Sequence, residues 1–209
     1  EDGLLRPLII KLMCDSHDPE ATSHALGLFK QANQPNSVAG SLRSTIFATA
    51  AEQRGAVEFE RLLNWHKTTT SAEERVDLAA GLSATIQPEL AKIALGLLTS
   101  KSVKKQDVHF WFKSLMRNPH TRVETWQWLQ TNWEWVKHNF SSDFGYTKFP
   151  SSSAAAFSTP EHLGIYKKFF TPLLDEPALT RNIRQGLEEI ESRMLWRQRD
   201  LDDVAGYLK

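Results

Sequence analysis

The sequence contains repeated signals for the start of an α-helix and none of the sustained alternation that marks β-strands. In "DPEATSHALGLF", Asp18 can cap a helix and Pro19 can occupy its first turn, before apolar residues at helical spacing. Ser71 and Glu74 have the spacing of a capping box, and Thr159 stands directly before a proline and an acidic residue. Because a strand requires apolar and polar residues in alternation, these patterns restrict the chain to an all-α fold.

The signals and the apolar spacing between them predict ten helices with mostly short connections. The predicted ranges are 4–14, 19–32, 37–53, 56–68, 72–84, 88–99, 104–117, 120–140, 160–174 and 177–207, the last with a break near Trp196. Short connections make neighbouring helices antiparallel, so the series favours an α–α superhelix of stacked antiparallel helix pairs, similar to HEAT and armadillo repeats. Residues 141–157 are predicted to be a long irregular segment within a single domain, 1–209.

The composition argues against several classes of partner. Lys plus Arg and Asp plus Glu each number 25, so the formal net charge is zero and the basic surplus of a nucleic-acid-binding protein is missing. There is no apolar run of about eighteen residues, so no membrane span is expected. The single cysteine, Cys14, excludes an intrachain disulfide and fits a reducing, cytoplasmic compartment. The start at Glu1, without a methionine or a leader, is interpreted as a cut inside a longer protein.

Four of the seven tryptophans lie in one segment, "WQWLQTNWEWV". At about 100° per residue, Trp126 and Trp133 fall on one side of a helix, and Trp128 and Trp135 form a second stripe nearly opposite. Two opposed stripes predict a helix that is covered on both sides, so the four rings are interpreted as helix packing. The alternative is an aromatic pair offered to a partner. A nucleic-acid platform is disfavoured because the segment contains Glu134, with Glu124 just before it, and no interleaved Arg or Lys.

The common catalytic motifs are absent from the sequence. There is no His-x-x-x-His pair, no Gly-rich phosphate loop and no Gly-x-Ser-x-Gly nucleophile elbow. The residues alone therefore predict no catalytic site, no metal site and no cofactor within this chain.

Several segments, taken together in order and spacing, resemble the C-terminal helical domain of the zinc aminopeptidases of the aminopeptidase N family. They are "DPEATSHALGLF", the region from "LRSTIFATAAEQR" to "GLSAT", "QD", "NP", "W…NW", "FSTPEHLGIYKKFF" and "RNIRQGLEEIESRMLW". The likeness runs over almost the whole chain and is strongest to bacterial, lactic-type members. None of these motifs is diagnostic by itself.

The resemblance implies a non-catalytic C-terminal domain of a longer zinc metallopeptidase involved in peptide catabolism. In that family the zinc-binding and amine-binding motifs lie in a separate catalytic domain, and none of them occurs here, so this fragment alone is predicted to be inactive. The implied partners are the catalytic domain of the same parent chain and peptide substrates. The domain is expected to cap the active-site cavity and to govern peptide access.

Arg117 and Arg122, which flank "NPHT", are predicted to face that cavity, where a guanidinium could pair with a peptide carboxylate. The rival interpretation of the chain is a free-standing helical-repeat scaffold that binds a protein partner.

Overall fold

A computed structural model describes residues 2–143 and 145–208. Over these residues the chain has twelve α-helices, two short 3-10 helices and no strand. It divides into two compact units, with the boundary between Glu124 and Thr125 inside one helix. The predicted all-α fold of paired helices is confirmed.

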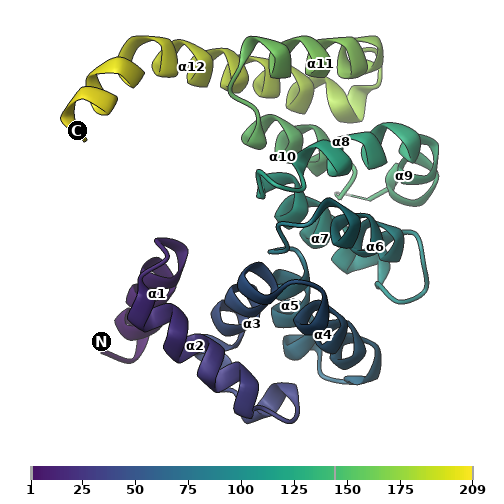
Figure 1. The fold of residues 1–209 in the computed structure, drawn as a ribbon. Coiled ribbons are helices and arrows are strands. Elements are labelled where there is room, and N and C mark those ends of the chain that lie inside the picture. The colour runs from purple at the N-terminus through teal and green to yellow at the C-terminus, as the bar shows by residue number, and fades with distance from the viewer. Residues whose placement is uncertain (1, 144, 209) are drawn as a thin grey trace. The chain divides into compact units, whose positions relative to one another are not determined.

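The first unit contains seven helices and the start of an eighth (Figure 1). They are α1 (Asp2–Asp15), α2 (Pro19–Gln31), α3 (Gly40–Arg54), α4 (Ala56–Thr68), α5 (Ala72–Leu82), α6 (Pro88–Leu98), α7 (Lys105–Arg117) and α8 (Arg122–Thr131), with a 3-10 helix, η1, at Pro35–Ser37. α1 contacts α3, α3 contacts α5 and α5 contacts α7, so these helices form a row. α2, α4 and α6 each contact the next helix of that row. We call α1, α3, α5 and α7 the odd-numbered row.

Local sequence signals start several of these helices as predicted. The Asp18 side chain accepts a hydrogen bond of 2.8 Å from the Ala21 amide and caps α2. Ser71 Oγ accepts from the Glu74 amide at 3.3 Å and caps α5. Each bond satisfies an amide that has no partner within its own helix.

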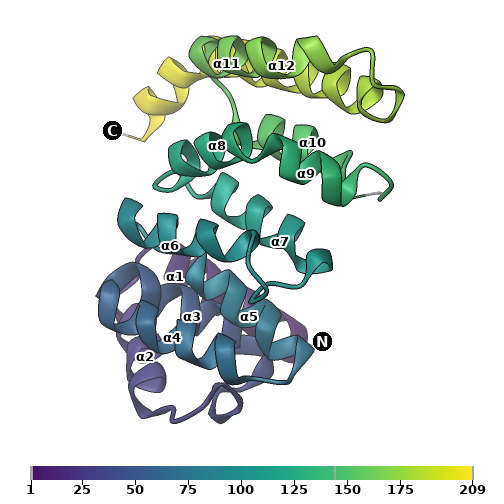
Figure 2. The same cartoon turned by 90° about the vertical axis from the view of Figure 1, so that its right-hand side faces the viewer.

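The second unit contains the rest of α8 and four further helices. They are α9 (Trp133–Phe140), α10 (Lys148–Ala156), α11 (Pro160–Phe170) and α12 (Pro177–Tyr207), with a 3-10 helix, η2, at Thr171–Leu173. α12 contacts both α10 and α11, and Figure 2 shows α11 running alongside it. The predicted cap of α11 is confirmed, because Thr159 Oγ1 accepts from the His162 amide at 3.2 Å.

Three predictions about where helices are continuous or absent were wrong. The single helix at 120–140 is two helices, because the backbone of Asn132 leaves the helical region, with φ −105° and ψ 17°. The segment 141–157 is not irregular throughout, since it contains α10. Pro150 is the third residue of α10, where a missing amide hydrogen removes no intrahelical bond. α12 continues past Trp196 without a break.

Candidate functional site

The first unit has a pocket of about 660 Å³ on the odd-numbered row. α1 contributes Lys11 and Asp15, α3 contributes residues from Ser44 to Glu52, and α5 contributes Ala80, with Ser83 directly after its last residue. The remaining wall comes from the end of α7 and the turn after it, which includes Arg117, Asn118, Pro119 and His120. Segments far apart in the sequence thus meet at one site.

The Asn-Pro turn after α7 is fixed by one side chain. Asn118 Nδ2 donates to the Ser83 carbonyl at 3.0 Å and to the Thr85 carbonyl at 2.8 Å. Asn118 Oδ1 accepts from the His120 amide at 3.0 Å. A single amide therefore ties the end of α7 to the segment after α5, and it uses both its donor and acceptor groups.

The two arginines predicted to face a cavity have different environments. Arg117 is exposed and lines the pocket. Arg122 does not line it, because its guanidinium turns back to the carbonyls of Met116 and Arg117, at 3.3 and 3.4 Å. These carbonyls belong to the last turn of α7, where a cation is favourable. Burial lowers the pKa of Arg122, which remains a cation at neutral pH.

The mouth of the pocket carries both signs of charge. Lys11 pairs with Asp15 one helical turn away on α1. His17 adopts a left-handed backbone conformation, φ 58°, at the end of α1, and its ring lies 3.9 Å from the Glu52 carboxylate. The sequence alone does not point to these residues, because the pairing of α1 with α3 carries no local signal.

The pocket wall also contains an unsatisfied hydroxyl. Ser83 is 3% exposed, and its Oγ has no hydrogen-bond partner in the part of the chain that the structure describes. An unpartnered buried hydroxyl is costly, so it marks this wall as a place where a polar group of a ligand or a water would be favourable.

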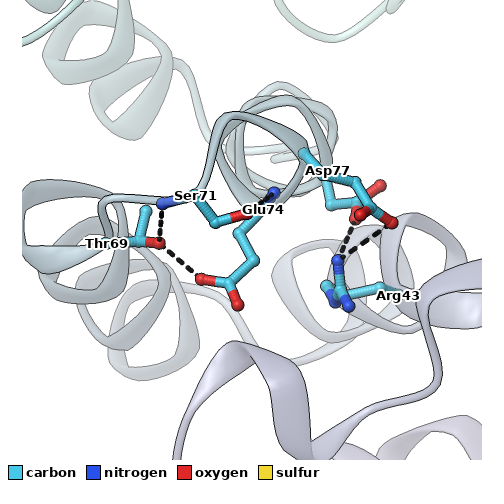
Figure 3. A network of polar contacts seen from close by, with 6 residues as sticks. Arg43, Thr69, Ser71, Glu74 and Asp77 are labelled. Carbon is cyan, nitrogen blue, oxygen red and sulfur yellow. Dashed lines mark hydrogen bonds and ion pairs between the residues drawn. The ribbon is translucent and has the colours of Figure 1, made fainter.

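An ion pair between Arg43 and Asp77 joins α3 to α5 (Figure 3). Arg43, 7% exposed, donates through Nη1 to Asp77 Oδ2 at 2.8 Å, and Glu73 lies 3.6 Å away. Burial raises the pKa of Asp77, and the hydrogen bond and charge of Arg43 oppose that rise. In the same view, Thr69 Oγ1 donates to Glu74 and accepts from the Ser71 amide. This network fixes the spacing of two helices that line the pocket.

The four clustered tryptophans belong to the second unit and do not line this pocket. Trp126 and Trp133 are buried, and both contact Phe169 and Phe170 edge to face, with ring centroids 5.4 to 5.9 Å apart. Their rings fill the space between α8, α9 and α11.

Trp128 is also buried, and Trp135 is partly exposed. Their ring centroids lie 6.2 Å apart, and Trp135 also contacts Phe140. These two rings therefore pack on each other and do not form an exposed pair.

The described residues offer no metal centre. Residues 2–143 and 145–208 contain no group of three or more His, Cys, Asp or Glu side chains that could hold a metal ion. Over the same residues, no helix combines the length and apolar character that crossing a bilayer requires. The pocket has the charges and hydrogen-bonding groups of a binding site for a polar ligand.

Comparison with known proteins identifies the family. A family described as "ERAP1-like C-terminal domain" matches residues 1–192. Among curated proteins, the chain is 27% identical over 213 residues to an aminopeptidase N of Lactococcus lactis, with all of this chain and 25% of the relative covered. It is 26% identical over 198 residues to an aminopeptidase N of Lactobacillus helveticus, covering 93% of this chain and 23% of the relative.

The same similarity extends to an aminopeptidase A of Gloydius brevicauda, at 26% identity over 99% of this chain and 22% of the relative. The chain thus spans about a quarter of the length of the curated relatives it matches. With the family match covering all but the last 17 of its 209 residues, the chain belongs to the ERAP1-like C-terminal domain family.

Proposed function

We propose that the chain is the non-catalytic C-terminal domain of a metallo-aminopeptidase, in which it caps the active-site cavity and governs the access of peptides. The parent enzyme removes N-terminal amino acids from peptides. The observation that carries the proposal is the coverage: almost the whole chain matches a C-terminal domain family, yet it spans about a quarter of the aminopeptidases it resembles. The catalytic groups are then expected in the other three quarters.

The zinc of such an enzyme belongs to the catalytic domain in this proposal. The described residues of this chain do not fit a zinc site, since no three suitable ligands come together. The chain's own contribution is therefore to bind and position the peptide, and no chemical step is assigned to it.

Arg117 is the residue we assign to substrate binding. It is exposed at the pocket, and no ion pair is found for its side chain within the described residues. It is therefore free to pair with the carboxylate at the far end of a peptide through charge-assisted hydrogen bonds. Arg122 is excluded from this role because its guanidinium caps α7.

The test uses the full-length protein that contains this chain, as wild type and as Arg117→Ala. The charge-matched control is Lys113→Ala, an exposed position on the same helix outside the pocket. Substrates are an alanine anilide and a series of peptides of increasing length, each with a free or an amidated C-terminus. We expect Arg117→Ala to raise KM about tenfold for the longer free-acid peptides, with no change for amidated peptides or the anilide.

Three outcomes separate the parts of this proposal. If Arg117→Ala and Lys113→Ala behave alike on free-acid peptides, Arg117 has no role in substrate binding. If the full-length wild type hydrolyses none of the substrates with zinc added, the aminopeptidase assignment fails. Protein binding without peptidase activity would instead favour the helical-repeat scaffold.

A further inference from the structure

A second pocket of the first unit, about 660 Å³ in volume, runs along α2. Its lining includes Pro19 and Lys30, which stand at the two ends of α2 and lie about 16 Å apart along the helix axis. The rest of the lining comes from the turn between α1 and α2, from Arg54 at the end of α3 and from Glu58 and Arg61 of α4. We call this pocket the α2 groove.

The lining of the α2 groove has a surplus of positive charge. It contains three cations, Lys30, Arg54 and Arg61, and one carboxylate, Glu58. The whole chain has no net charge, so this surplus is a local property of the groove. Lys30 and Arg54 are exposed, and neither side chain has an ion pair or hydrogen bond within residues 2–143 and 145–208. Both can therefore pair with a negatively charged ligand.

Two further carboxylates near the groove already have partners. Asp18 accepts a hydrogen bond from the Ala21 amide at 2.8 Å and caps α2. Glu52 lies 3.9 Å from the ring of His17, the one residue that lines both the α2 groove and the pocket on the odd-numbered row. Because Asp18 places a negative charge at the amide end of α2, this end does not favour a phosphate group.

Arg61 is a fixed part of the groove wall. Its guanidinium lies over the rings of Phe29 and Trp65, 4.7 Å from each centroid, and it donates to the carbonyls of Phe29 and Ala32. These bonds leave other N–H donors of the guanidinium unused. The unused donors belong to a side chain that is already ordered, so an anion that accepts from them immobilises no further rotamers.

The middle of the groove is uncharged and open. An added Cβ at Gly27 would meet nothing within 4 Å, and Leu26 beside it is partly exposed. Thr22 Oγ1 is buried without a hydrogen-bond partner among the described residues, so a polar ligand atom would be favourable at this wall. Phe29, the one phenyl ring in the lining, is 2% exposed and offers no face for a nucleobase to stack on.

We propose that the α2 groove binds an extended acidic peptide segment whose carboxylates pair with Lys30 and Arg54. An extended chain rises about 3.3 Å per residue, so about five residues span the length of α2 that lines the groove. A small anion such as phosphate would fill only a fraction of a pocket of this volume. The ligand is recognised by carboxylates of its side chains, so the proposal depends neither on Arg117 nor on peptidase activity.

The test is fluorescence anisotropy with the full-length protein that contains this chain. The probe is a labelled peptide of about five residues with glutamate at each end and apolar residues between, and its control has glutamine at both ends. Both peptides are acetylated and amidated, so they have no free amine for an aminopeptidase and no terminal carboxylate for Arg117. We expect the glutamate peptide to bind at least about tenfold more tightly than the glutamine peptide at low ionic strength.

Charge reversal tests the two assigned cations. Lys30→Glu combined with Arg54→Glu should abolish binding of the glutamate peptide and should create binding of a matching lysine peptide, because the sign of the groove is reversed. Binding of the lysine peptide would also show that the double variant is folded. Lys67→Glu combined with Lys101→Glu is the charge-matched control at two exposed positions outside the groove, and it should bind like wild type.

Filling the groove without changing its charge is a second test. Gly27→Leu places an apolar side chain in the open space beside α2 and should weaken binding of the glutamate peptide at least about tenfold. Gly96→Leu on α6 is the matched control, because an added Cβ there also meets nothing within 4 Å and the residue lies outside the groove. Its affinity should equal that of wild type.

Several results would overturn the proposal. They are equal affinity of wild type for the glutamate and glutamine peptides, equal loss of binding in the two charge-reversal variants, and unchanged binding by Gly27→Leu. Displacement of the probe by succinate or inorganic phosphate as readily as by the unlabelled peptide would instead identify a site for small anions. Anilide hydrolysis by the same samples reports on the proposed function separately.

Discussion

His66 is a buried histidine whose environment favours the neutral ring. It is 4% exposed, its ring lies edge to face with Trp111 at 5.2 Å, and its Nδ1 has no hydrogen-bond partner among the described residues. Burial lowers the pKa of His66, the charge of Arg75 lowers it further, and Asp107 acts in the opposite direction. The native state therefore resists protonation at this position.

We predict that His66 makes the protein less stable in mild acid. The unfolded chain takes up this proton near pH 6.5 and the native state only at lower pH, so the unfolded state binds more protons in between. The free energy of unfolding then falls as the pH drops below about 6.5. Urea unfolding at pH 7.5 and 5.5 should show a smaller loss for His66→Gln than for wild type. His24→Gln, at an exposed position on α2, serves as the control. An equal loss in wild type and His66→Gln would contradict the prediction.

The two arginines of the candidate site show what sequence can and cannot predict for single residues. Both flank the same Asn-Pro turn, and the predicted helices 104–117 and 120–140 correctly leave that turn between two helices. Whether a side chain points into a pocket or back to a carbonyl, as Arg122 does, depends on tertiary packing, which the sequence does not encode locally. Lys11 and Ser83 were missed for a related reason, since the pocket joins helices that are remote in sequence.

At the level of elements, α10 and α12 approach closely at Gly186. A Cβ at this position would lie 2.2 Å from Tyr166 Oη and 2.9 Å from the Ala154 Cβ, and both of those residues are fully buried. The small side chains of α10, which include Ser153 and Ala154, make this approach possible. The serine- and alanine-rich segment that resembled a loop is therefore a packing surface.

Gly186→Ala should destabilise the protein although alanine is the better helix former. The clash is expected to cost about 1–3 kcal/mol and to outweigh a gain in helix propensity of about 1 kcal/mol. Gly164→Ala on α11 is the matched control, since an added Cβ there meets nothing within 4 Å, and it should stabilise by about 0.5–1 kcal/mol. Chemical denaturation measures both. Similar shifts for the two variants would show that α12 can move away from α10.

Helix starts were predictable and helix interruptions were not. Asp18, Ser71 and Thr159 cap their helices by bonds to residues three positions ahead, so the signal is local. The helix is interrupted at Asn132, whose backbone has φ −105° and ψ 17°, although its amide still donates to the Trp128 carbonyl at 2.9 Å. Asparagine is tolerated inside many helices, so its presence alone does not predict the break.

At the scale of the whole molecule, apolar side chains are exposed on both terminal helices. The last turns of α12 expose Leu201, Val204 and Tyr207, and Leu208 directly after them is exposed as well. On α1 the exposed apolar side chains are Leu5, Leu8, Ile9, Leu12 and Met13. Patches of this kind favour association when no partner covers them. Sequence patterns could not show that these surfaces are exposed, because the apolar residues of a covered helix face have the same spacing.

The 209-residue chain by itself should therefore self-associate at high concentration. Leu8→Glu combined with Leu201→Glu should reduce this association, because each substitution places a charge in an apolar stripe. Val57→Glu combined with Val123→Glu changes two valines that are more exposed but isolated, and it should leave the association unchanged. Sedimentation velocity over a range of concentrations measures the effect. The prediction fails if both double variants associate like wild type.

The amide that fixes the pocket wall is also chemically durable. Asparagine side chains age by deamidation when the backbone nitrogen of the next residue attacks the amide carbon and forms a cyclic imide. The residue after Asn118 is Pro119, whose nitrogen carries no hydrogen and is a poor nucleophile for this reaction. Conversion to aspartate would replace a donor to two carbonyls, those of Ser83 and Thr85, by a negative charge that repels them. The Asn-Pro pair thus protects the turn from a common form of spontaneous damage over the lifetime of the protein.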